Sequence, residues 1–228
     1  MDVSTILDTL NGPQREAVSC DKKSVLVLAG AGSGKTRVLV HRIAWLLQVK
    51  QVSPASIMAV TFTNKAAKEM RGRISELLKI TPQGMWVGTF HGLAHRLLKS
   101  HWQDAGLTEN FQILDSEDQL RMVKRLIKEH DLDEGRFAPK SLQWFINGHK
   151  DEGRRAKHVD HHNDVYEKTL VQLYVAYEQA CDRSGQVDFG ELLLRAHELW
   201  LNKPAILNHY QQRFQHLLVD EFQDTNTI

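Results

Sequence analysis

The segment 29–36 reads Ala-Gly-Ala-Gly-Ser-Gly-Lys-Thr and has the composition of a phosphate-binding loop. Glycine adopts positive φ readily, so successive backbone N–H groups of such a loop can turn towards one phosphate chain. Lys35 would reach the β- and γ-phosphates of a nucleotide, and the Thr36 hydroxyl would bind Mg²⁺. The first position of this motif is normally glycine and is Ala29 here. A chance Gly-Lys-Thr in an ordinary strand–turn–helix is the simpler alternative, and the flanking sequence argues against it.

The residues on either side of this loop have the patterns that a P-loop requires. Val25–Leu28 is a short apolar run, typical of a fully buried strand that would end at Ala29. After the loop, Leu39, Ile43 and Leu46 recur at helical spacing. The sequence therefore predicts strand, loop and helix in order, with the helix N-terminus adding its dipole to the phosphate site.

A second group of candidate catalytic residues follows a short apolar strand, 217–219, near the other end of the chain. A P-loop enzyme needs an acidic residue near its Mg²⁺, and Asp220 at the strand tip would hold that ion. Glu221 would orient and deprotonate the attacking water, and Gln223 could sense the γ-phosphate. Asp-Glu after a strand is common, so the pair gains its meaning from the loop upstream.

Gln14 is a candidate for reading the base of the nucleotide. Asn11-Gly12-Pro13 predicts a helix start, which places Gln14 in the first turn. A carboxamide can pair with both N7 and N6 of adenine. A glutamine at a helix start is more often simply solvated, so this interpretation depends on the phosphate loop.

Two further strand–helix connections carry the residue types that bind single-stranded nucleic acid. The strands expected at 57–62 and 85–89 run into loops that expose Phe62 and Phe90. Aromatic rings stack on bases, and polar or basic neighbours reach phosphates. Residues 64–99 hold seven Lys or Arg and two acids, a local excess of 7 − 2 = +5 in a chain whose net charge is +1. The plainer alternatives are a core position for Phe62 and solvated faces for the basic residues.

The middle of the chain is predicted to be helical. Ser116–Gln119 has the pattern of a capping box, an apolar stripe from Leu170 to Cys181 closes near Gly185, and Asp188 begins a third helix. These apolar residues are expected to form a core and not a cofactor site.

Alternating strands and helices around a helical stretch predict an α/β fold. We expect a P-loop NTPase (RecA-like) parallel sheet built from residues 1–89 and 215–228, with an inserted all-helical subdomain at 90–214. Hydrophobic content of 42% and charged content of 25% are ordinary for globular proteins. Two widely spaced cysteines and the absence of a long apolar stretch predict a cytoplasmic protein that makes no use of a membrane.

Four stretches together resemble the successive motifs of the UvrD/PcrA/Rep group of superfamily-1 DNA helicases. They are Ala29–Thr36, Thr61–Met70, Gly88–Leu93 and Val219–Thr225. The resemblance runs from about Leu10 to the end of the chain. It implies an ATP- and Mg²⁺-dependent translocase that moves 3′ to 5′ on single-stranded DNA and acts in nucleotide excision and mismatch repair. It implies as partners single-stranded DNA, junctions of single- and double-stranded DNA, and repair proteins.

The same resemblance implies roles for individual residues. Gln14 and Arg37 would contact the adenine, and Phe62, Thr63, Asn64 and His91 would contact DNA. The nucleotide-binding set expected from loop and resemblance together is Gln14, Ala29, Gly30, Ala31, Gly32, Ser33, Gly34, Lys35, Thr36 and Arg37.

Members of this group need a second RecA-like domain, which closes over the nucleotide and supplies arginine fingers. We find no second set of strand–helix repeats, so we expect the N-terminal half of a helicase that does not unwind DNA alone. Two other classes stay open. A P-loop kinase for a small metabolite is disfavoured because Asp220 and Glu221 supply a water-activating acid. A DNA-binding module with a vestigial nucleotide site is disfavoured because Lys35 and Thr36 are intact as well.

Overall fold

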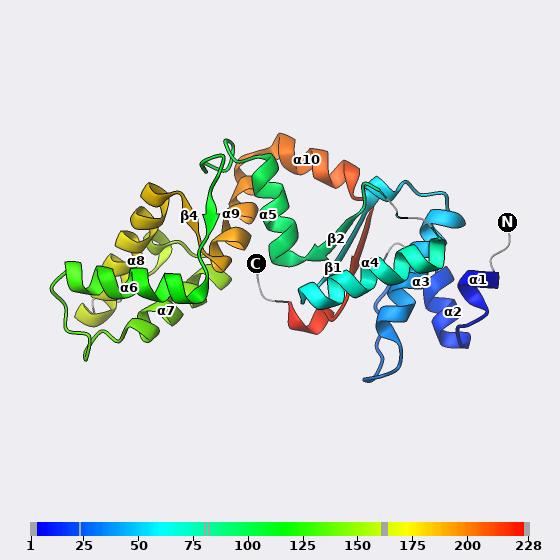
Figure 1. Ribbon diagram of the computed structural model, residues 1–228, viewed down its shortest axis with the longest axis horizontal. Helices are drawn as coiled ribbons and strands as arrows, with labels where there is room; N and C mark the ends of the chain where they lie inside the picture. The colour runs from blue at the N-terminus through cyan, green and yellow to red at the C-terminus, as the bar shows by residue number, and fades with distance from the viewer. Residues whose placement is uncertain (1–3, 23, 80, 82, 161–163, 226–228) are drawn as a thin grey trace. The chain divides into compact units, whose positions relative to one another are not determined.

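The computed structural model describes residues 4–22, 24–79, 81, 83–160 and 164–225 (Figure 1). The ends of the first predicted domain, 1–3 and 226–228, lie outside the described residues. The helices and strands are α1 Ser4–Leu7, α2 Gly12–Ser19, α3 Lys35–Gln48, η1 Pro54–Ser56, β1 Ile57–Thr61, α4 Asn64–Leu78, β2 Trp86–Thr89, α5 Phe90–Ser100, β3 Gln112–Ile113, α6 Ser116–Glu129, α7 Pro139–Asp151, η2 Ala156–His158, α8 Val165–Ser184, β4 Gln186–Val187, α9 Phe189–Asn202, α10 Pro204–Arg213, β5 His216–Val219 and η3 Phe222–Asp224.

The chain divides into two compact units. The first comprises the described residues up to Leu93 together with Asn208–Thr225, and the second comprises Ala94–Leu207. The first contains the parallel sheet, and the second is mainly helical. Within the described residues, no helix is long and apolar enough to cross a bilayer.

The sheet of the first unit is parallel, as the alternating pattern predicts, with strand order β2-β1-β5. In register, Thr61 of β1 stands beside Thr89 of β2, and Val60 stands beside Val219 of β5. The three strands therefore end at the same edge. The residues that follow Thr61, Thr89 and Val219 therefore leave the sheet at this edge. In α/β proteins, ligands bind at the edge formed by the carboxyl ends of the strands.

Helices α3 and α4 pack together beside this sheet (Figure 1). Their apolar faces form one core with β1, and Ile43, Ile57 and Met70 in it are completely buried. Helix α4 begins where the Thr63 hydroxyl accepts a hydrogen bond from Ala66 N at 3.1 Å, a standard N-cap. Packing in this shared core therefore positions the N-termini of α3 and α4.

The prediction of a buried strand at Val25–Leu28 is wrong. These residues adopt no regular structure, and their exposed fractions run from 40% to 85%. Ala29 consequently does not end a strand. The reason is that an apolar run becomes a strand only where a neighbour pairs with its backbone. Within the described residues, β1 pairs with β2 and β5, and the run before the loop joins none of them.

The second unit is built on the core of α6, α7 and α8. Tyr174 and Tyr177 of α8 are completely buried there, and Gly185 ends that helix in the left-handed conformation, as predicted. The capping box predicted at 116–119 is wrong by one residue. Asp115 is the N-cap of α6, because its carboxylate accepts from two backbone N–H groups, and Gln119 turns into the interior.

A buried ionic network joins α7 to α9 in the second unit. Lys150 Nζ lies 2.7 Å from Asp188 Oδ2 and 2.9 Å from Glu191 Oε2, and all three side chains are at most 4% exposed. Arg155 and Arg195 bind the same Glu191 carboxylate at 2.8 and 2.6 Å. Burial alone would raise the pKa of Glu191, but Lys150, Arg155 and Arg195 together hold it well below its usual range.

Removing Lys150 takes from the buried Asp188 carboxylate the cation that Lys150 supplies, and it takes from Glu191 one of its three cations. We expect Lys150→Ala to cost about 3–5 kcal/mol of unfolding free energy, the usual cost of removing one partner of a buried pair. Lys140→Ala is the matched control, because Lys140 is an exposed lysine on the same helix. Urea denaturation followed by far-ultraviolet circular dichroism measures both. Equal midpoints for the two variants would contradict the importance of the network.

Candidate functional site

The loop at 29–36 has the backbone of a phosphate cradle. Gly32 and Gly34 adopt φ of +74° and +86°, where other residues are strained. Ser33 N donates to Gly30 O at 3.3 Å, closing the turn. Lys35 Nζ donates to the carbonyl oxygens of Ala29 and Gly30 at 3.2 and 3.3 Å. The ammonium group is therefore held across the loop itself, at the N-terminus of α3.

A direct contact joins this loop to the acidic residues. Thr36 Oγ1 donates to Asp220 Oδ2 at 3.1 Å, although 184 residues separate the two in sequence. Asp220 follows β5, is 7% exposed, and is anchored by its backbone N donating to Val60 O at 2.9 Å. A hydroxyl and a carboxylate side by side are hard oxygen donors of the kind that Mg²⁺ prefers.

The two residues predicted to act on the attacking water lie in the next turn. Glu221 adopts φ +53°, a left-handed conformation that is uncommon outside glycine. Gln223 Nε2 donates to Glu221 Oε2 at 2.5 Å. The Gln223 carboxamide thereby orients the Glu221 carboxylate, and Glu221 follows Asp220 directly in the chain.

Gln14 lies against the phosphate loop, from α2. Its Nε2 donates to Ser33 O at 2.9 Å, and its Oε1 accepts from Asn11 N at 3.1 Å. Asn11 Oδ1 in turn accepts from Gln14 N at 3.0 Å, which completes a capping box. Arg37 contacts the segment just before α2, where its Nη2 donates to Thr9 O at 2.8 Å.

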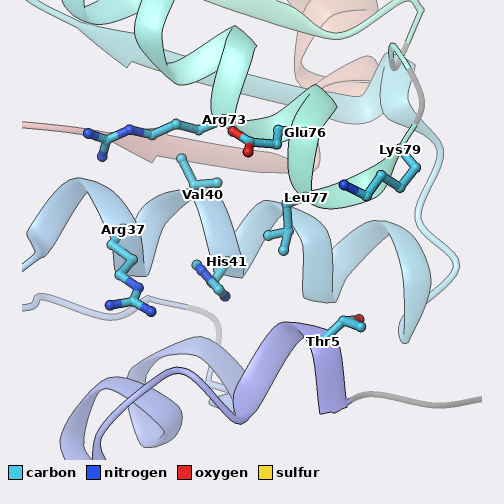
Figure 2. Close-up of a pocket in the computed structure, with 8 residues that line it drawn as sticks. All are labelled: Thr5, Arg37, Val40, His41, Arg73, Glu76, Leu77 and Lys79. Carbon is cyan, nitrogen blue, oxygen red and sulfur yellow. The ribbon is translucent and has the colours of Figure 1, made fainter.

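A groove of about 580 Å³ runs between α1, α3 and α4 beside Arg37 (Figure 2). Its lining combines three cationic side chains and one carboxylate with apolar residues. It is lined by Thr5, Arg37, Val40, His41, Arg73, Glu76, Leu77 and Lys79. The sequence alone does not indicate this groove, because its cations come from α3 and from α4 with its C-cap, which only the tertiary fold brings together.

The predicted DNA-contact residues gather at the ends of β1 and β2. Because Thr61 and Thr89 are in register, the residues that follow them meet, and the rings of Phe62 and Phe90 lie 5.4 Å apart, edge to face. Phe62 is 36% exposed. The remaining predicted residues lie at the starts of the two following helices. Thr63 is the N-cap of α4, Asn64 is its first residue, and His91 is in the first turn of α5.

Comparison with known proteins decides the family. A family model described as the UvrD/REP helicase N-terminal domain matches residues 10–228. The chain belongs to the UvrD/REP helicase family. The resemblance drawn from the four motifs is therefore confirmed. The α/β architecture with a parallel sheet agrees with a P-loop NTPase of this family.

Individual relatives within the UvrD/REP family are similar over essentially the whole chain. DNA helicase II of Escherichia coli (strain K12) is 64% identical over 228 residues, which is 100% of this chain and 32% of the relative. DNA helicase II of Haemophilus influenzae is 59% identical, with 100% and 32% covered. ATP-dependent DNA helicase PcrA of Leuconostoc citreum is 41% identical, with 99% and 30% covered. The chain thus spans about a third of the length of these relatives.

The fold brings the predicted site residues together in two groups. The loop, Thr36, Asp220 and Gln14 form one group, and Phe62 with its neighbours at the ends of β1 and β2 forms the other. Asn11 is the partner that the sequence reasoning missed. The Asn-x-x-Gln spacing at a helix start is a capping-box signal that identifies it.

Phe62 was expected either to stack on bases at the surface or to pack in the core, and its exposure of 36% favours the surface position. Truncating a core phenylalanine costs about 3–5 kcal/mol of stability, and a base stacked on an aromatic ring contributes about 1–3 kcal/mol to binding. We expect Phe62→Ala to change the melting temperature little and to weaken binding of single-stranded oligonucleotides. Phe137→Ala, at a residue 4% exposed in the core of the second unit, should show the large loss of stability.

Thermal unfolding and fluorescence anisotropy measure the two effects. A Phe62→Ala variant that melts as early as Phe137→Ala and binds DNA normally would contradict the prediction that Phe62 contacts DNA.

Proposed function

We propose that this chain is the ATP-binding part of an ATP-dependent DNA helicase that translocates 3′ to 5′ along single-stranded DNA. The hydrogen bond between Thr36 and Asp220 carries the proposal, because it joins the phosphate loop to the acid that such hydrolysis requires. Its RecA-like first unit would bind nucleotide. Its second unit would be the inserted helical subdomain. The relatives named as DNA helicases support the activity, over a third of their length.

ATP and Mg²⁺ fit the first group of residues. The backbone of residues 29–36 and Lys35 would hold the phosphates, with Gln14 and Arg37 on the adenine side. Thr36 and Asp220 offer two adjacent oxygen ligands, and a bound Mg²⁺ would neutralise charge on the phosphates. Glu221, oriented by Gln223, would accept the proton of the attacking water.

Single-stranded DNA is the proposed partner of the second group. The rings of Phe62 and Phe90 offer faces to bases, while Thr63, Asn64 and His91 offer hydrogen bonds to the backbone. These residues and Asp220 stand at the same edge of one sheet, because Thr61 pairs with Thr89 and Val60 with Val219. Nucleotide hydrolysis and DNA contact would therefore be coupled through the ends of neighbouring strands.

The wider setting follows from the same family membership. We infer a cytoplasmic protein that acts at junctions of single- and double-stranded DNA in nucleotide excision and mismatch repair, with repair proteins as partners. Two free cysteines agree with a reducing compartment. We infer that unwinding needs two RecA-like domains, because the second would close over the nucleotide and supply arginine fingers.

The proposed role of Glu221 is tested by Glu221→Gln in a chimera in which this chain replaces the matching segment of E. coli DNA helicase II. The variant keeps the shape of the site and deletes the base. We expect nucleotide binding within about twofold of the wild type and hydrolysis reduced by roughly 10²–10⁴-fold, the usual contribution of a general base. Glu134→Gln, at an exposed acid of the second unit, is the control.

The assay is ATP hydrolysis with and without single-stranded DNA. Wild-type turnover by Glu221→Gln would contradict the assignment. Hydrolysis by the unmutated chimera that DNA does not stimulate would favour a metabolite kinase or another P-loop enzyme.

A further inference from the structure

We propose that Asn11 is a positioning residue that fixes the orientation of the Gln14 carboxamide and so makes this site prefer adenine to guanine nucleotides. The inference rests on the proposed function, in which Gln14 contacts the base. It adds the residue that determines which end of that side chain donates and which end accepts.

The two ends of the Gln14 carboxamide have partners of opposite character. The Asn11 backbone N–H is a donor, so it can only face the side-chain oxygen, at 3.1 Å. The Ser33 carbonyl is an acceptor, so it can only face the side-chain nitrogen, at 2.9 Å. A flipped amide would put two donors together at one end and two acceptors together at the other. These two contacts therefore determine the orientation of the group.

This arrangement leaves one hydrogen-bonding capacity free at each end of the amide. A carboxamide has two N–H donors and two oxygen lone pairs, and the protein contacts use one of each. One donor and one acceptor remain. Adenine offers N7 as an acceptor and N6–H as a donor, which match them, whereas guanine offers acceptors at both N7 and O6. With the amide held in this orientation, guanine would place its O6 against the Gln14 oxygen.

The Asn11 side chain holds the framework of these contacts. Its Oδ1 accepts from Gln14 N at 3.0 Å, while residue 11 keeps the extended conformation of an N-cap, with φ −75° and ψ 172°. That conformation is what directs the Asn11 N–H at the glutamine oxygen. Without a side-chain acceptor at position 11, the first turn of α2 loses its cap, and the backbone N–H that faces the Gln14 oxygen is no longer held in place by that cap.

The phosphate loop supplies the other constraint and leaves little room for a different position. A Cβ built on Gly34 would stand 3.1 Å from Gln14 Nε2, so the loop packs closely against the amide. Because Ser33 belongs to the loop, the base-reading group and the phosphate cradle share a hydrogen bond. Base selectivity is therefore expected to depend on Asn11, whose side chain acts through the backbone N–H of Gln14.

The experiment measures dissociation constants of MgATP and MgGTP for the 228-residue chain and three variants. Asn11→Ala removes the acceptor, and Asn11→Asp keeps an acceptor that caps equally well. Gln14→Ala removes the base contact itself. Tripolyphosphate binding reports whether the loop is intact in each variant, and thermal unfolding reports whether each is folded. The decisive quantity is the ratio of the two nucleotide affinities, because a general loss of helix stability lowers both together.

We expect the preference for ATP to fall roughly five- to a hundredfold in Gln14→Ala, the discrimination of one bidentate base contact. Asn11→Ala should lose a large part of the same preference, Asn11→Asp should keep it, and tripolyphosphate should bind both Asn11 variants as it binds the wild type. A normal ratio in Asn11→Ala beside a collapsed ratio in Gln14→Ala would overturn the role of Asn11 alone. A normal ratio in Gln14→Ala would overturn the proposed adenine contact and this inference with it.

Discussion

The hydrogen bond from Thr36 to Asp220 is the contact on which the site depends, because it joins two ends of the sequence at one point. Thr36 is fixed at the start of α3, and Asp220 is fixed by its place after β5 and its bond to Val60 O. Neither residue alone distinguishes a nucleotide site from an ordinary turn. Their contact requires that β5 pair in parallel with β1 and that α3 pack on the core shared with β1.

The parallel sheet turns that contact into a larger surface. Strands β2, β1 and β5 end at one edge, so Phe90, Phe62 and Asp220 are carried to it by register rather than by sequence proximity. The proposed DNA-binding residues thus follow β1 and β2, and the proposed metal-binding residue follows β5. In strand order, β5 with Asp220 lies directly beside β1 with Phe62.

Local chemistry was predictable from the sequence, and long-range pairing was only partly so. Glycine spacing identified the loop, and apolar runs identified β1 and β2 within a residue of their observed bounds. The prediction of a strand at Val25–Leu28 was wrong because apolar composition indicates a preference for burial but does not identify the strand that would pair with its backbone. The N-cap of α6 was predicted at Ser116, one residue too late, because the Asp115 carboxylate is a stronger hydrogen-bond acceptor than the Ser116 hydroxyl. The role of Asn11 needed coordinates, because only they show the two contacts of Gln14.

The most direct test of the account is whether Thr36 and Asp220 bind one metal ion together with the nucleotide. Mn²⁺ in place of Mg²⁺ allows the bound ion to be followed by electron paramagnetic resonance in the 228-residue chain with ATP. The account predicts that Asp220→Asn and Thr36→Val each weaken metal-dependent ATP binding and leave the binding of metal-free ATP unchanged. Wild-type Mn²⁺ affinity and spectra in both variants would contradict it.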